Sequence, residues 1–136
     1  MTATNEATAF EWGGLKFDVA TRSAGATLRV FGKTGESWTE MLRFDDFVEP
    51  HYHVPASGPA IEFDRSLGEP LAWYIAEIRD HLAECVSRAG FTEVLPTIDF
   101  EEVSRHSGTL NEAMTGSVPS DCVRVPGFGV QRRESS

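Results

Sequence analysis

The chain has 136 residues, of which 40% are hydrophobic and 24% are charged, values typical of one globular domain. It carries 12 Lys and Arg against 21 Asp and Glu, a formal net charge of −9. Because a negative field repels phosphate groups, this charge argues against nucleic acid and membrane surfaces as partners. No apolar run approaches the roughly 20 residues of a membrane span, and residues 1–10 show no secretory pattern. With two cysteines, Cys85 and Cys122, we expect a cytoplasmic protein with reduced thiols.

Residues 1–64 read mainly as strands. Apolar and polar residues alternate at 15–19 and again at 28–30, and glycine-containing turns at 13–14 and 32–35 separate the runs. A long strand-like stretch follows from Glu36, and a short strand is expected at 60–63. The short connections leave no room for the crossover helices of a parallel sheet. We therefore expect an antiparallel β-meander of five or six strands.

Residues 66–115 read mainly as helices. Apolar residues recur at three- and four-residue spacing over 71–89, a period that predicts one long amphipathic helix, with Pro70 in its first turn and Gly90 after its end. Shorter helices are expected at 98–106 and 110–114, and residues 116–136 are expected to form an irregular tail. The predicted architecture is a single α+β domain over 1–136, in which the long helix covers one face of the meander.

The segment 49–55, Glu-Pro-His-Tyr-His-Val-Pro, concentrates the unusual chemistry of the chain. In a strand, His51 and His53 would place both imidazoles on the same face, about 7 Å apart along the chain. If the strand ran unbroken from residue 42, Asp45 and Glu49 would share that face and the even-numbered apolar residues would face the core. Pro50 interrupts the pattern, because proline cannot donate to a ladder, so a bulge or an edge position is expected there.

Two imidazoles beside a carboxylate can bind a transition metal, transfer protons near neutral pH or orient a ligand. We therefore predict His51, His53 and Glu49 as catalytic residues, and His51 and His53 as ligands if a metal is used. On this interpretation the protein is a small-molecule enzyme, such as a lyase, an isomerase or a cyclase, that works without a cofactor or with one divalent transition metal.

The alternative is a non-catalytic binding or accessory module, in which the two histidines lie at the rim of an edge strand. A half-covered sheet with exposed edges favours pairing with a second copy. The expected partners are a small-molecule ligand and, through the open sheet face, a second chain in a homodimer.

His51-Tyr52-His53 resembles the HxH element of cupin metal sites, which implies that the two histidines bind a metal. The glutamate that a cupin places three or four residues later is missing, since Ser57 and Gly58 stand there and Glu62 follows later. More widely, Leu-Arg-Phe-Asp at 42–45, Pro-His-Tyr-His at 50–53 and the following helix are similar to a family of small uncharacterised bacterial α+β domains. That resemblance covers residues 26–90 and implies the architecture without an activity.

Overall fold

Six strands pair in chain order to form one antiparallel sheet in the computed structural model, which describes residues 7–134. The strands are β1 (Ala7–Trp12), β2 (Leu15–Arg22), β3 (Gly25–Thr34), β4 (Ser37–Phe47), β5 (His51–His53) and β6 (Ile61–Glu62). The predicted α+β class and the antiparallel meander are therefore confirmed. The alternation that predicted the strands arises because β2, β3 and β4 each bury one face and leave the other more accessible.

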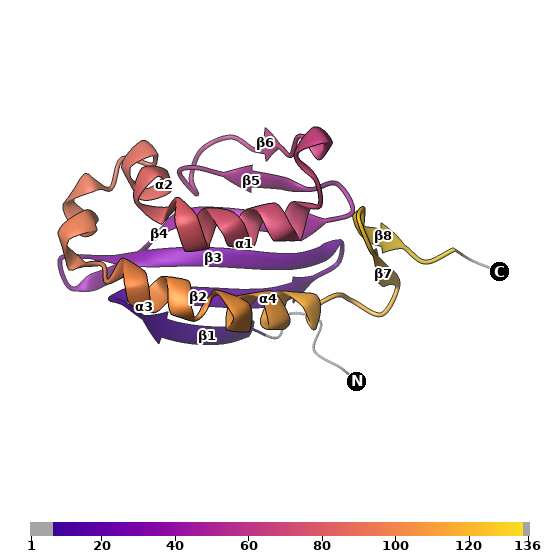
Figure 1. Cartoon of the computed structure of the whole chain (residues 1–136), viewed down its shortest axis with the longest axis horizontal. Helices are drawn as coiled ribbons and strands as arrows, with labels where there is room; N and C mark the ends of the chain where they lie inside the picture. The colour runs from indigo at the N-terminus through magenta and orange to yellow at the C-terminus, as the bar shows by residue number, and fades with distance from the viewer. Residues whose placement is uncertain (1–6, 135–136) are drawn as a thin grey trace.

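Helices cover one face of this sheet (Figure 1). The helical segments of the chain are η1 (Arg65–Leu67), α1 (Pro70–Asp80), α2 (Leu82–Arg88), η2 (Thr92–Thr97), α3 (Phe100–Arg105) and α4 (Ser107–Thr115). The short η1 buries no residue and leads into α1. Among the described residues, no helix is both long and apolar enough to cross a membrane.

The single long helix predicted for residues 71–89 is wrong, because the segment forms two short helices that meet at His81. The backbone of His81 has φ −132° and ψ 21°, outside the helical range, and belongs to neither helix. The chain changes direction there (Figure 1). Ile75 and Ile78 of α1 and Leu82 of α2 are nevertheless all buried in one core. The apolar period thus continues across a break in the backbone.

Stability should depend on Ile78 and Leu82 much more than on Glu84. Ile78 and Leu82 are 1% and 3% exposed, whereas Glu84 is exposed on α2. Truncating a buried Ile or Leu to Ala typically costs about 2–5 kcal/mol, so Ile78→Ala and Leu82→Ala should lower the free energy of unfolding by that amount. Glu84→Ala should change it by less than about 0.5 kcal/mol in the same urea titrations. Coincident unfolding curves for all three variants would contradict this helix orientation.

The C-terminal segment also differs from the prediction of an irregular tail over 116–136. It contains a hairpin of β7 (Cys122–Val125) and β8 (Gly129–Arg132), which packs against the end of β4. Cys122 and Val130 are buried there, and Arg124 Nη2 lies 2.8 Å from Asp46 Oδ2. Strands this short show little periodicity, and they are stabilised by contacts with residues far away in the sequence. The sequence pattern therefore does not predict them.

Candidate functional site

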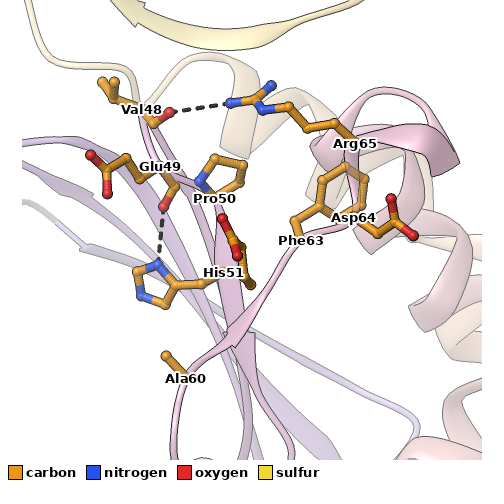
Figure 2. A pocket seen from close by; sticks show the side chains of 9 residues that line it. Val48, Glu49, Pro50, His51, Ala60, Phe63, Asp64 and Arg65 are labelled. Carbon is orange, nitrogen blue, oxygen red and sulfur yellow. Dashed lines mark hydrogen bonds between the residues drawn. The ribbon is translucent and has the colours of Figure 1, made fainter.

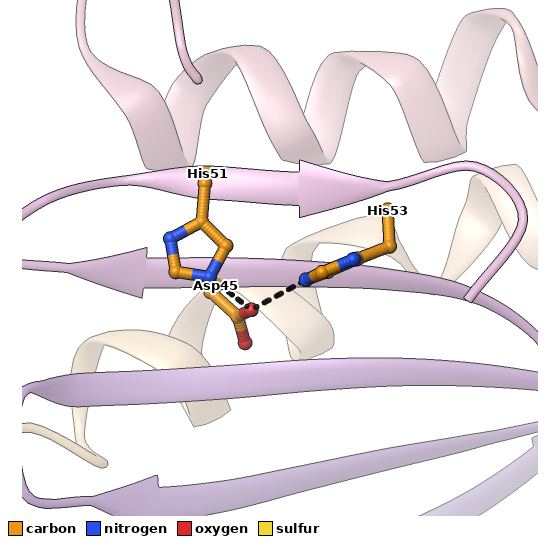
Figure 3. A group of neighbouring side chains, drawn as sticks. All are labelled: Asp45, His51 and His53. Atoms are coloured by element: carbon orange, nitrogen blue, oxygen red, sulfur yellow. Dashed lines mark ion pairs between the residues drawn. The ribbon is translucent and has the colours of Figure 1, made fainter. Parts of the chain in front are cut away.

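The hairpin of β4 and β5 brings Asp45, His51 and His53 together, a group that we call the Asp–His–His site (Figure 3). Residues 48–50 form a loop between the two strands, in place of the bulge or edge position expected at Pro50. Asp45 therefore lies directly opposite His51 across the ladder, instead of six residues before it on one strand. The expected interruption at Pro50 is a complete reversal of the chain.

The site lies on the sheet face opposite the helices. Phe44, which precedes Asp45 in β4, is the ladder partner of Tyr52, which lies between His51 and His53 in β5. Their ring centroids lie 5.2 and 6.2 Å from that of Tyr74 in α1. Because successive side chains of a strand point to opposite faces, Asp45 and His51 point away from the helical layer. The two histidines therefore share one face of the sheet, as predicted, and Asp45 lies on that face with them.

The reactive atoms of the three side chains converge within 4.8 Å of one another. The Nε2 atom of His51 lies 2.9 Å from Asp45 Oδ2, and the Nε2 atom of His53 lies 3.7 Å from the same oxygen. The Asp45 side chain is 5% exposed and the His51 side chain 29%, so solvent reaches the site mainly past His51. The site is a sheltered carboxylate between two imidazoles.

Main-chain carbonyls fix which nitrogen of each imidazole carries the hydrogen. His51 Nδ1 lies 3.0 Å from the carbonyl oxygen of Glu49, and His53 Nδ1 lies 2.9 Å from that of Gly58. A carbonyl oxygen can only accept, so each Nδ1 donates its hydrogen. In a neutral imidazole, each Nε2 then holds a lone pair that points towards the Asp45 carboxylate.

Three acceptor atoms that face one another need a positive charge between them. A proton on an imidazole can supply it, and so can a metal ion. The arrangement is thus suited to the acid–base chemistry and to the metal binding predicted from the His-x-His pattern.

Two hydroxyl groups hold this arrangement in place. Thr27 Oγ1 of β3 donates to Asp45 Oδ1 at 2.9 Å. Tyr74 Oη of α1 lies 3.1 Å from the main-chain carbonyl of Asp45 and 3.2 Å from that of His51, so it connects the two strands from the core side. Burial raises the pKa of Tyr74 well above its ordinary value, which keeps this hydroxyl a neutral donor.

Arg43 places a cation beside the site, because it lies opposite His53 in the ladder. Its guanidinium binds both carboxylate oxygens of Glu40, at 2.9 and 3.1 Å. These hydrogen bonds raise the pKa of Arg43 above its ordinary value, so it stays charged and paired. Pairing with Glu40 limits the repulsion that Arg43 would exert on a cation bound at Asp45.

An open pocket of about 800 Å³ borders His51 (Figure 2). The loop residues 48–50 line one side, and β6 and η1, which carry Glu62 and Arg65, line the other. Glu49, predicted as catalytic, contacts the His51 ring through its main-chain carbonyl, and its carboxylate is outside the Asp–His–His site. The pocket has room for a small metabolite next to the histidine.

Sequence reasoning missed Thr27, which the sheet register brings to the site, and Glu62, which it brings to the wall of the pocket. Thr27 lies opposite Asp45, and Glu62 lies opposite His51. The alternation places Asp45 on the histidine face, but the predicted site residues are His51, His53 and Glu49 and do not include it. The signal that could have found it is the Pro50 break, because a reversal there would make residues 45 and 51 partners.

These features define a small α+β domain with a polar site on the uncovered face of its sheet. The family model described as "Domain of unknown function (DUF7700)" matches residues 9–114, and the chain belongs to this family. The match confirms the predicted relationship to a family of small uncharacterised domains. It includes the Asp–His–His site and ends before the β7–β8 hairpin. No curated protein and no solved structure matches the chain.

Proposed function

We propose that the protein binds one divalent transition-metal ion through Asp45, His51 and His53, and uses it in a reaction on a small molecule in the adjoining pocket. The observation that carries this proposal is the pair of Nδ1–carbonyl hydrogen bonds, which direct both Nε2 lone pairs to Asp45. Histidines that bind metals usually donate their other ring N–H in this way, because the bond fixes the ring and its tautomer.

The distances are close to those of a metal centre. A metal bound at about 2.0–2.1 Å by nitrogen and oxygen separates neighbouring ligand atoms by roughly 2.9–3.4 Å. The Nε2–Oδ2 distance of 2.9 Å for His51 fits this range, and a rotation of His53 towards Asp45 would bring its distance of 3.7 Å into the range as well. Two imidazoles and one carboxylate suit zinc, iron, cobalt, nickel or copper better than calcium or magnesium.

Three protein ligands leave positions for water or substrate, which is typical of catalytic rather than structural metal sites. An ion in this site would polarise a carbonyl group or lower the pKa of a bound water molecule. Either effect supports the predicted lyase, isomerase or cyclase chemistry. Acid–base catalysis by His51 and Asp45 without a metal is the second candidate, favoured by their 2.9 Å contact.

Metal titration of the full chain, purified without an affinity tag and treated with a chelator, tests the proposal. We expect one Co²⁺ or Zn²⁺ ion per chain by calorimetry, and a visible absorption band for Co²⁺. The ion should also raise the free energy of unfolding by about 2.7 kcal/mol at a hundredfold excess over the dissociation constant. Binding seen only at millimolar metal, with no stabilisation, would overturn the metal function and leave the acid–base candidate.

The small-molecule ligand, the homodimer and the cytoplasmic location stay predictions. The pocket beside His51 supports the prediction of a small-molecule ligand, and the uncovered sheet face supports that of a homodimer.

A further inference from the structure

We infer that Thr27 is a positioning residue that holds Asp45 as a one-oxygen ligand, so that the metal keeps adjacent open positions for a small molecule that binds through two oxygen atoms. The inference rests on the proposed metal site. It adds a residue outside the three ligands and a chemical class for the molecule that they receive.

The sheet register places Thr27 where this role requires it. Thr27 of β3 is the partner of Asp45 in β4, and Asp45 is the partner of His51 in β5, so the three residues form a row across the sheet. Directly opposed residues have Cβ atoms about 4.5–5.5 Å apart, which lets a short hydroxyl side chain reach a neighbouring carboxylate. The Thr27 hydroxyl lies 2.9 Å from Asp45 Oδ1.

Because of this hydrogen bond, the two carboxylate oxygens of Asp45 have different partners. Oδ1 accepts from Thr27, whereas Oδ2 faces both Nε2 atoms. Thr27 is 3% exposed, so water does not readily replace Asp45 as the partner of its hydroxyl. To bind a metal through both oxygens, Asp45 would have to turn Oδ1 towards the ion and away from Thr27, which would weaken this buried bond. The geometry therefore favours binding through Oδ2 alone.

An ion held by three single-atom ligands has room for at least one more ligand, and for three in octahedral geometry. Its protein ligands come from β4 and β5, and the pocket of about 800 Å³ lies beside His51, its most exposed ligand. Two adjacent free positions on this side would accept a chelating pair of oxygens. A second oxygen from Asp45 would occupy one of them, so Thr27 would control access by controlling how Asp45 binds.

The experiment compares Co²⁺ binding by the wild-type full chain with that by Thr27→Val, Thr27→Ser and Thr97→Val. Valine keeps the branched shape of threonine and removes the hydroxyl, and serine restores it. Thr97→Val is the matched control, because its part-buried hydroxyl donates to the Val94 carbonyl at 2.7 Å in η2, outside the site. Acetohydroxamate, which binds metals through two oxygens, and azide, which uses one atom, serve as probes.

We expect Thr27→Val to weaken Co²⁺ binding about 10–100-fold, the usual effect of losing a contact that supports a metal ligand. Its Co²⁺ absorption should shift and weaken as Asp45 binds through both oxygens, and acetohydroxamate should lose more affinity than azide. Thr27→Ser should restore both the spectrum and the preference for acetohydroxamate. Thr97→Val should behave like the wild type.

The two proposals fail in different ways. If the wild type takes up no Co²⁺, the proposed metal function fails. If it does, and Thr27→Val keeps the affinity, the spectrum and the probe preference, the role of Thr27 is overturned and the metal site stands. Thr27→Ala, which also removes the hydroxyl, replaces Thr27→Val if circular dichroism shows that the valine variant does not fold. If Thr27→Val and Thr97→Val lose the same amount of stability and their Co²⁺ spectra are unchanged, the role of Thr27 is structural only.

Discussion

The double substitution His51→Ala/His53→Ala should abolish metal binding, while either single substitution should only weaken it. The double variant retains Asp45 alone, and one carboxylate does not hold a transition metal against water. Each single variant keeps one imidazole and Asp45. The affinity of each single variant for the metal should therefore fall by more than the roughly 10–100-fold typical of a lost supporting contact, but binding should still be measurable. Calorimetry and the Co²⁺ spectrum measure both effects.

The control for this series is His81→Ala. The His81 side chain is 52% exposed and lies 3.5 Å from Glu84 on the helical layer, away from the Asp–His–His site. It should bind metal like the wild type. All variants should remain folded by circular dichroism, because His51 and His53 lie on the uncovered face of the sheet and outside the apolar core.

A different result would favour the binding-module interpretation. If both single variants keep full metal and ligand binding and alter only the association state in analytical ultracentrifugation, His51 and His53 act at an interface. The enzyme proposal would then lose the residues on which it depends.

The fold could be predicted from the sequence where each element has a local pattern. Strands with one buried face alternate with period two, and the helical stretch from residue 71 has a period near 3.6, so both classes were recognised. The break at His81 could not be recognised in this way, because the three- and four-residue spacing of the apolar residues continues across it. The β7–β8 hairpin was missed since its anchor, Arg124 against Asp46, joins distant parts of the chain.

The candidate site, like the fold, could be predicted only where its residues lie close together in the sequence. His51 and His53 stand two residues apart in β5, so they share a face whatever precedes them. Thr27 has no local signal, because its contact with Asp45 depends on the register between β3 and β4. Glu49 was selected from the alternation, yet it lies in the loop, where its carbonyl group contacts His51.

Arg124→Ala should be strongly destabilising, because it leaves the Asp46 carboxylate buried without its cation. Asp46 is 0% exposed, and its Oδ2 atom lies 2.8 Å from Arg124 Nη2. Breaking a buried pair by removing one partner typically costs about 3–5 kcal/mol. Urea unfolding should show this loss at neutral pH. The variant Asp46→Asn/Arg124→Met, which removes both charges, should recover much of the stability.

The pH dependence of this loss distinguishes a buried charge from a simple packing defect. Burial raises the pKa of Asp46 above its ordinary value, and Arg124 opposes this shift. Without Arg124 the folded-state pKa should rise further, so the folded chain binds a proton more readily than the unfolded chain. Stability should then decrease as the pH rises from the ordinary Asp range through the raised pKa, and mild acid should reduce the deficit of Arg124→Ala relative to wild type.

A deficit that is independent of pH, or a double variant as unstable as Arg124→Ala, would contradict this account of the hairpin anchor. Metal binding provides an independent readout. Asp45 and Asp46 are neighbours on β4 and point to opposite faces of the sheet, Asp45 to the site and Asp46 to Arg124. Folded Arg124→Ala protein should therefore bind Co²⁺ with the affinity of the wild type. If it does not, the anchor and the site are coupled through the backbone of β4.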